Sequence, residues 1–105
     1  MMNEITANKK AGVRIEEIRS VISEIAEQYA IKKATLFGSR ADGSNRENSD
    51  IDLILEFNRP VTLIFLSGLK LRLEERTGLS VDIIHGPIRE SDMIEVGKVV
   101  ELYAA

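Results

Sequence analysis

The stretch GSRADGSNRENSDID, residues 38–52, decides the fold and the chemistry of this 105-residue chain. A glycine–serine turn opens it, a polar loop follows, and two aspartates with one residue between them close it. Because successive side chains of a strand point to opposite faces, Asp50 and Asp52 share one face, while Ile51 and Leu53 on the other can pack into a core. Two neighbouring acids repel each other unless they hold a cation such as Mg²⁺, which takes one or two carboxylates together with substrate phosphates. The spacing therefore indicates nucleotide chemistry.

A third acid lies in a later stretch, Ser80–Ile84, which reads as a short β-branched strand. A lone carboxylate at Asp82 is costly to bury unless it is paired or metal-bound. If this strand lies beside the first acidic strand, Asp82 approaches Asp50 and Asp52. Three carboxylates suit a two-metal site, whose ions, roughly 3.5–4 Å apart, hold the attacking and leaving oxygens of a displacement. The alternative for Asp82 is an edge-strand charge that faces water.

The glycine–serine turn, the paired aspartates and the later strand acid, in this order along the chain, resemble the signature of the DNA polymerase beta-like nucleotidyltransferase superfamily. Gly38-Ser39 is followed, after ten residues, by Asp50-Ile51-Asp52, and the later strand supplies Asp82. The short chain resembles the minimal nucleotidyltransferase (MNT, or MntA-like) branch, whose members act as antitoxins beside HEPN ribonuclease toxins. The resemblance covers the chain from about Ile15 to the C-terminus.

The resemblance implies transfer of AMP from ATP to a hydroxyl, that of a tyrosine, on a HEPN-type RNase toxin. The chain would then be the antitoxin of a type VII-like toxin–antitoxin pair. Asp50, Asp52 and Asp82 would be both the catalytic residues and the ligands of Mg²⁺, two ions in all, with ATP as the substrate. Two alternatives stay open: an antitoxin that blocks the toxin sterically without catalysis, and a subunit of a small-molecule, aminoglycoside-like nucleotidyltransferase.

The candidate nucleotide-binding residues are Gly38, Ser39, Arg40 and Ser49. Glycine lets the backbone approach a phosphate, and N–H groups at a helix start, with the Ser39 hydroxyl, could bind the β- and γ-phosphates. The planar fork of Arg40 could brace a phosphate, and Ser49 is expected to orient the loop or cap its turn. An ordinary turn and a surface arginine are the alternatives. His85, the only histidine, could face the site, but an exposed position in a loop is expected.

Composition limits the partners that the chain can have. The net charge of −3 and the pI of about 5.2 argue against direct nucleic-acid binding, which usually needs a basic surface. Without cysteine, neither disulfides nor thiolate metal sites can form. No stretch reads as a membrane span or a signal peptide, so a cytoplasmic location is expected. Because a single domain of this size leaves no room for an acceptor-binding domain, we expect a heterocomplex with the acceptor protein, or a homo-oligomer.

The expected fold is of the α/β class, a small mixed sheet with helices packed on it, as in the polymerase beta palm. One domain is expected over residues 1–105, with a frayed terminus at 1–9. The leucines of the second long helix form its core-facing stripe: Leu63, Leu66, Leu69 and Leu73. The expected helices span about 10–30, 61–77 and 92–103, with a short one at 39–41, and the expected strands span 33–37, 50–57 and 80–85.

Overall fold

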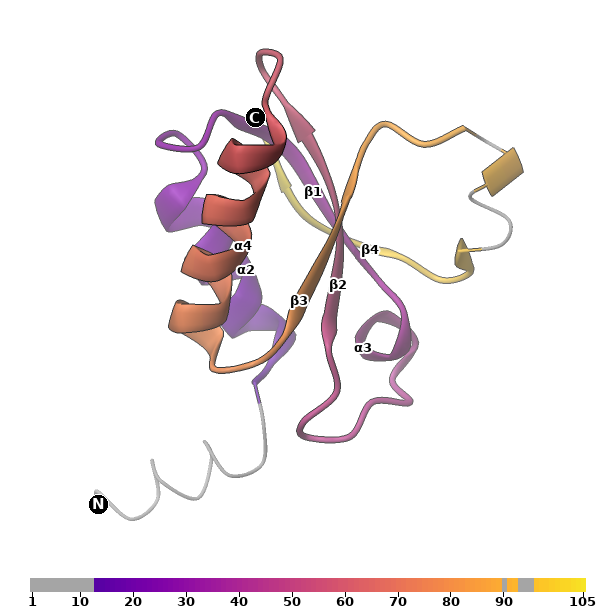
Figure 1. Cartoon of the computed structure of the whole chain (residues 1–105). Helices are drawn as coiled ribbons and strands as arrows, with labels where there is room; N and C mark the ends of the chain where they lie inside the picture. The colour runs from indigo at the N-terminus through magenta and orange to yellow at the C-terminus, as the bar shows by residue number, and fades with distance from the viewer. Residues whose placement is uncertain (1–12, 90, 93–95) are drawn as a thin grey trace.

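The computed structural model describes residues 13–89, 91–92 and 96–105, and shows a mixed sheet with α2 and α4 packed side by side on one face (Figure 1). This confirms the predicted α/β class, while the predicted frayed terminus lies outside the described residues. No helix within those ranges is both long enough and apolar enough to cross a membrane. The helices are α2 (Ile15–Ile25), α3 (Ser39–Asp42) and α4 (Leu63–Thr77), and the strands are β1 (Ile31–Phe37), β2 (Ile51–Phe57), β3 (Val81–His85) and β4 (Val100–Ala104).

The order of the strands in the sheet is β3-β2-β1-β4. The central strand β1 pairs antiparallel with both β2 and β4, whereas β2 and β3 run parallel. A parallel pair needs a crossover, and α4 supplies it between β2 and β3. The crossover brings the start of β3 beside the start of β2, which is where each of these two strands carries its acid.

The core lies between the sheet and the two long helices. Alternation along β2 buries Ile51, Leu53 and Leu55 as the sequence predicts. The apolar stripe of α2 covers them, because residues three and four apart share a helix face. Side chains that are at most 5% exposed include Ile18, Ile22, Ile25, Ala34, Leu36, Ile51, Leu53, Leu55, Leu69, Leu73, Val81 and Leu102.

Helix α2 ends at Ile25, five residues before the predicted end. The backbone then turns: Ala30 adopts a left-handed conformation with φ of 54°, and the Ile31 N–H donates to the Ala26 carbonyl. This closure resembles a glycine-terminated helix end, but it uses an alanine. The sequence therefore offers no glycine to mark the end of the helix.

The predicted helix over 92–103 is wrong at its C-terminal end, where the chain forms the edge strand β4. Strand β4 pairs with β1, placing Ala34 opposite Tyr103 and Leu36 opposite Val100. Gly97, with φ of 81°, separates this strand from the helical residues before it, and residues 93–95 lie outside the described ranges. A free edge on β1 and the buried position of Leu102 outweigh the local helical pattern.

The prediction that Leu63 faces the core is also wrong. Leu63 is 81% exposed and takes no part in the core. Leu69 and Leu73, by contrast, are fully buried. Six residues separate Leu63 from Leu69, and at 100° per residue their side chains point about 120° apart. A run of three-residue spacings therefore drifts around the helix and leaves its first member outside the buried face.

Leu102→Ala tests whether β4 belongs to the core. Losing a buried leucine leaves a cavity, so we expect the free energy of unfolding to fall by about 2–5 kcal/mol in urea titrations. Glu101→Ala, on the same strand but exposed, is the matched control and should change stability by about 0.5 kcal/mol or less. Equal, small effects of the two changes would show that this strand does not pack as described.

Candidate active site

Two of the predicted acids meet at the start of the parallel strand pair. The register places Asp52 of β2 directly opposite Asp82 of β3. Both residues occupy the second position of their strands, so their side chains share the face of the sheet opposite to the core residues Leu53 and Val81. The sequence could only suggest this meeting, and the parallel register establishes it.

The electrostatics of the pair bear mainly on Asp52, which is half-buried, whereas Asp82 is exposed. Burial raises the pKa of the Asp52 carboxyl above its ordinary value, and the charges of Asp82 and Asp50 raise it further, as does a hydrogen bond shared with Asp82. Two carboxylates that repel each other in this way are favoured by a bound cation. The oxygen donors fit Mg²⁺, a hard ion that takes one or two protein carboxylates.

Asp50 lies just before β2 and is exposed. It is close enough to raise the pKa of Asp52, but it does not complete a cluster. Within the described parts of the chain, no three Asp, Glu, His or Cys side chains come together closely enough to hold a metal ion as they stand. The predicted trio is therefore an adjacent pair, Asp52 and Asp82, with Asp50 beside it.

Position 38 requires a glycine because its backbone lies against the Asp52 side chain. Strand β1 ends at Phe37, the partner of Asp52 in the antiparallel register, so the next residue passes over the Asp52 side chain. A β-carbon on Gly38 would overlap the Asp52 carboxylate. The backbone angles, φ 76° and ψ −158°, also belong to a region that is essentially restricted to glycine. Gly38 therefore packs directly against the Asp52 carboxylate.

Ser39 opens the four-residue helix α3 directly after Gly38, as the sequence predicts. Its position two residues beyond Phe37, the cross-strand partner of Asp52, keeps it at the acidic end of the sheet. Backbone groups at this helix start and the serine hydroxyl are donors of the kind that bind phosphate. The phosphate contact itself stays a prediction.

Arg40 has a different place from the one predicted. Its side chain is only 4% exposed, and it donates to the Ser49 carbonyl from Nε at 3.1 Å and from Nη2 at 2.9 Å. It also donates to the carbonyls of Val13 at 2.9 Å and Glu47 at 3.1 Å. The guanidinium therefore holds the loop that leads into Asp50, in place of the expected phosphate contact.

Ser49 caps the turn before the acids, which is one of the roles expected from the sequence. Its Oγ accepts from the Arg46 N–H at 2.8 Å, and its own N–H donates to the Arg46 carbonyl at 3.1 Å. With its carbonyl bound by Arg40, Ser49 is fixed on three sides. Its predicted contact with nucleotide stays a prediction.

His85 lies away from the acid pair. It is exposed, as expected, and its ring packs edge-on to Phe57 with 5.4 Å between the ring centroids. The register sets His85 opposite Leu55, three positions beyond the pairing of Asp52 with Asp82. His85 therefore has no direct place in the acid site.

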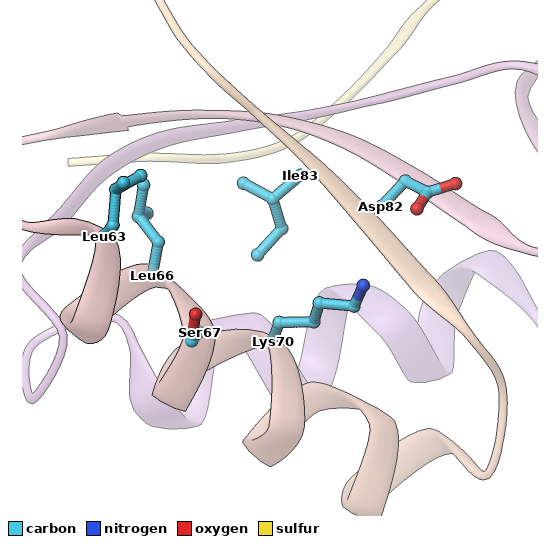
Figure 2. A pocket seen from close by; sticks show the side chains of 6 residues that line it. All are labelled: Leu63, Leu66, Ser67, Lys70, Asp82 and Ile83. Atoms are coloured by element: carbon cyan, nitrogen blue, oxygen red, sulfur yellow. The ribbon is translucent and has the colours of Figure 1, made fainter.

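A pocket of about 280 Å³ lies between α4 and β3, beside Asp82 (Figure 2). Lys70 extends along it toward the Asp82 end, opposite the leucines. Lys70 is not among the residues that the sequence predicts for the site, although its spacing from Leu63, Leu66 and Ser67 is typical of one helix face. The lining residues are Leu63, Leu66, Ser67, Lys70, Asp82 and Ile83.

Comparison with known families agrees with this geometry. The family described as polymerase beta, nucleotidyltransferase matches residues 20–99, a range that holds Gly38, Asp52 and Asp82. The chain belongs to this family of nucleotidyltransferases.

The chain is similar in sequence to two named relatives and in fold to a solved structure. The chain is 39% identical to "Putative protein adenylyltransferase MJ0435" of Methanocaldococcus jannaschii, over 69% of this chain and 77% of that protein. It is 31% identical to protein adenylyltransferase MntA of Thermococcus cleftensis, over 70% and 79%. The fold also matches a structure of the tri-AMPylated HEPN toxin of Shewanella oneidensis in complex with MNT antitoxin, with a TM-score of 0.64, 15% identity and coverage of 87% of this chain and 73% of that one.

Gly38→Ala tests the fit between the motif glycine and Asp52. Because the new methyl group would displace the carboxylate, we expect nucleotidyl transfer to fall by about 100-fold, the cost of a small misplacement of a reacting group. Gly43→Ala is the control: it has a similar φ of 86° but open space around it, so it should cost about 1 kcal/mol of stability and leave transfer intact. Full transfer by Gly38→Ala would contradict the described contact.

Arg40→Lys tests the hold on the loop. A lysine cannot reproduce the fork, and each lost bond to a charged donor is worth about 1.5–3 kcal/mol. We expect hydrogen exchange at the Ser49 amide to accelerate about tenfold or more, as one such bond predicts. Arg46→Lys, an exposed change in the same loop, should leave exchange unchanged. Equal exchange in both variants would remove Arg40 from this role.

Proposed function

We propose that the chain is a Mg²⁺-dependent protein adenylyltransferase that moves AMP from ATP to a tyrosine hydroxyl of a HEPN-type RNase toxin. It would thereby silence the toxin as the antitoxin of a type VII-like pair. The observation that carries the proposal is the in-register pairing of Asp52 with Asp82 beside the Gly38 turn. The names of the relatives support the class of reaction, and the toxin complex of the structural neighbour supports the kind of partner.

In this proposal, each residue of the site has a separate role in binding metal, binding phosphate or positioning the acids. Bound Mg²⁺, two ions as the sequence predicts, would neutralise the triphosphate, with Asp52 and Asp82 as ligands and Asp50 joining them. The Gly38 backbone would pass close to the phosphates, and the Ser39 hydroxyl would donate to one of them. Arg40 would act indirectly, by holding the loop that carries the acids.

The transfer itself needs one proton acceptor. The acceptor oxygen would bond to the α-phosphorus as the bond to the leaving pyrophosphate breaks, and the proton of the hydroxyl would pass to a carboxylate oxygen of Asp82. Asp82 suits this role because it is exposed, so that a hydroxyl from another protein can reach it. The half-buried Asp52 suits the ligand role.

Replacing each acid tests the proposal. With ATP labelled at the α-phosphate, Mg²⁺ and the HEPN-domain protein of the proposed pair, we expect Asp52→Asn and Asp82→Asn to lose label transfer while keeping their fold. Loss of charge repulsion should even raise the melting temperature of Asp52→Asn without metal. Glu56→Gln, on the same face of β2 but four residues further along, should transfer normally.

Two results would change the assignment. Normal transfer by Asp52→Asn would remove the acid pair from catalysis. No transfer by the wild-type chain, together with tight binding of the HEPN-domain protein, would favour an antitoxin that only blocks its toxin.

A further inference from the structure

Helix α4 turns three large apolar side chains to solvent. Leu63 is 81% exposed, Ile64 is 85% exposed and Leu71 is 63% exposed. Ile64 and Leu71 are seven residues apart, which places them on one helix face. Single exposed leucines are ordinary, but several on one helix mark a surface that another protein can cover.

Of these exposed side chains, Leu63 also lines the pocket between α4 and β3 (Figure 2). The volume of about 280 Å³ lies just below the range of about 300–1,000 Å³ for small-molecule sites, and it is lined on one side by a single helix. Such a space suits one protruding side chain of a partner, of the kind that anchors protein interfaces. Leu63, Leu66 and Ile83 form the apolar part of its wall.

The charge of Lys70 indicates which kind of group the pocket would bind. Lys70 is exposed and lies along the pocket, so a partner that seats an apolar side chain against Leu63 and Leu66 brings its neighbouring residues to the Lys70 ammonium. A carboxylate there would be complementary, whereas a basic group would be repelled. The pocket therefore suits an apolar side chain with an acidic neighbour.

The pocket and the acid site share a residue. Asp82 lines the pocket and is also the partner of Asp52 in the acid site. The Asp82 carboxylate lies on the other face of β3, but β3 is the edge strand of the sheet, so a protein anchored in the pocket is held at the edge beyond which this proposed proton acceptor lies. We propose that the α4–β3 pocket docks the acceptor protein, through an apolar side chain flanked by a carboxylate that pairs with Lys70. This inference rests on the proposed function, since it identifies where that acceptor binds.

Binding measurements separate docking from catalysis. We would titrate the HEPN-domain protein of the proposed pair into wild type, Leu63→Asp, Lys70→Glu and Arg72→Glu by calorimetry without nucleotide, and measure Mg²⁺–ATP binding to each separately. We expect the first two variants to weaken protein binding by about tenfold or more, as interface anchors do, and to bind Mg²⁺–ATP as wild type does. Both positions are exposed, so these variants should fold.

Arg72→Glu is the matched control. It makes the same charge change on the same helix, two residues from Lys70 and therefore on the opposite side, and should bind the partner normally. Wild-type-like binding by Lys70→Glu would overturn the docking site, and so would equal losses in Lys70→Glu and Arg72→Glu. Loss of Mg²⁺–ATP binding in Lys70→Glu with the partner still bound would also overturn it, by moving Lys70 to the nucleotide.

Failure of the proposed function would look different. A wild-type chain that binds the HEPN-domain protein but transfers no label would refute the adenylyltransferase. The same chain would retain the docking site if Lys70→Glu and Leu63→Asp still lost that binding.

Discussion

The parallel register that sets Asp52 against Asp82 is the constraint on which the rest of the site depends. Like charges on neighbouring strands are destabilising, so the pair exists because burial of Leu53 and Val81 on the other face fixes the register. A slip by one residue would turn the core side chains to solvent. Burial, and after it the charges of Asp82 and Asp50, raise the pKa of Asp52. The protonated Asp52 carboxyl stabilises the folded state fully below the ordinary pKa of 3.8, and this stabilisation is lost as the pH rises through the raised pKa. At neutral pH, therefore, the metal-free protein holds a repulsion that a cation can relieve.

Two other features keep the acids in place. Gly38 leaves room for the Asp52 carboxylate where any larger residue would collide with it, and buried Arg40 binds the carbonyls of the loop before Asp50. Both act on the position of the acids rather than on the reaction itself. Electrostatic catalysis depends on such preorganisation, because groups that are already oriented need no rearrangement as charge develops. The motif is thus a set of mutually fitted parts.

The sequence predicted what is encoded locally and missed what depends on distant contacts. The acids, the glycine turn and the apolar alternation of β2 lie within a few residues of one another, so pattern and chemistry were sufficient. Arg40 was misassigned because its acceptors are backbone carbonyls, which no side-chain pattern reveals. The edge strand β4 was missed because its stability comes from pairing with β1, far away in the chain. Leu63 was assigned to the core because a three-residue spacing conceals the rotation of the helix.

Titration of the Asp52 carboxyl by carbon-13 NMR, with and without Mg²⁺, tests the central claim most directly. We predict a pKa above the ordinary value in the metal-free protein. It should fall when Mg²⁺ is added, and it should fall in Asp82→Asn without metal because one repelling charge is removed. An ordinary pKa for Asp52 that neither Mg²⁺ nor Asp82→Asn alters would show that the two acids do not form a cation site.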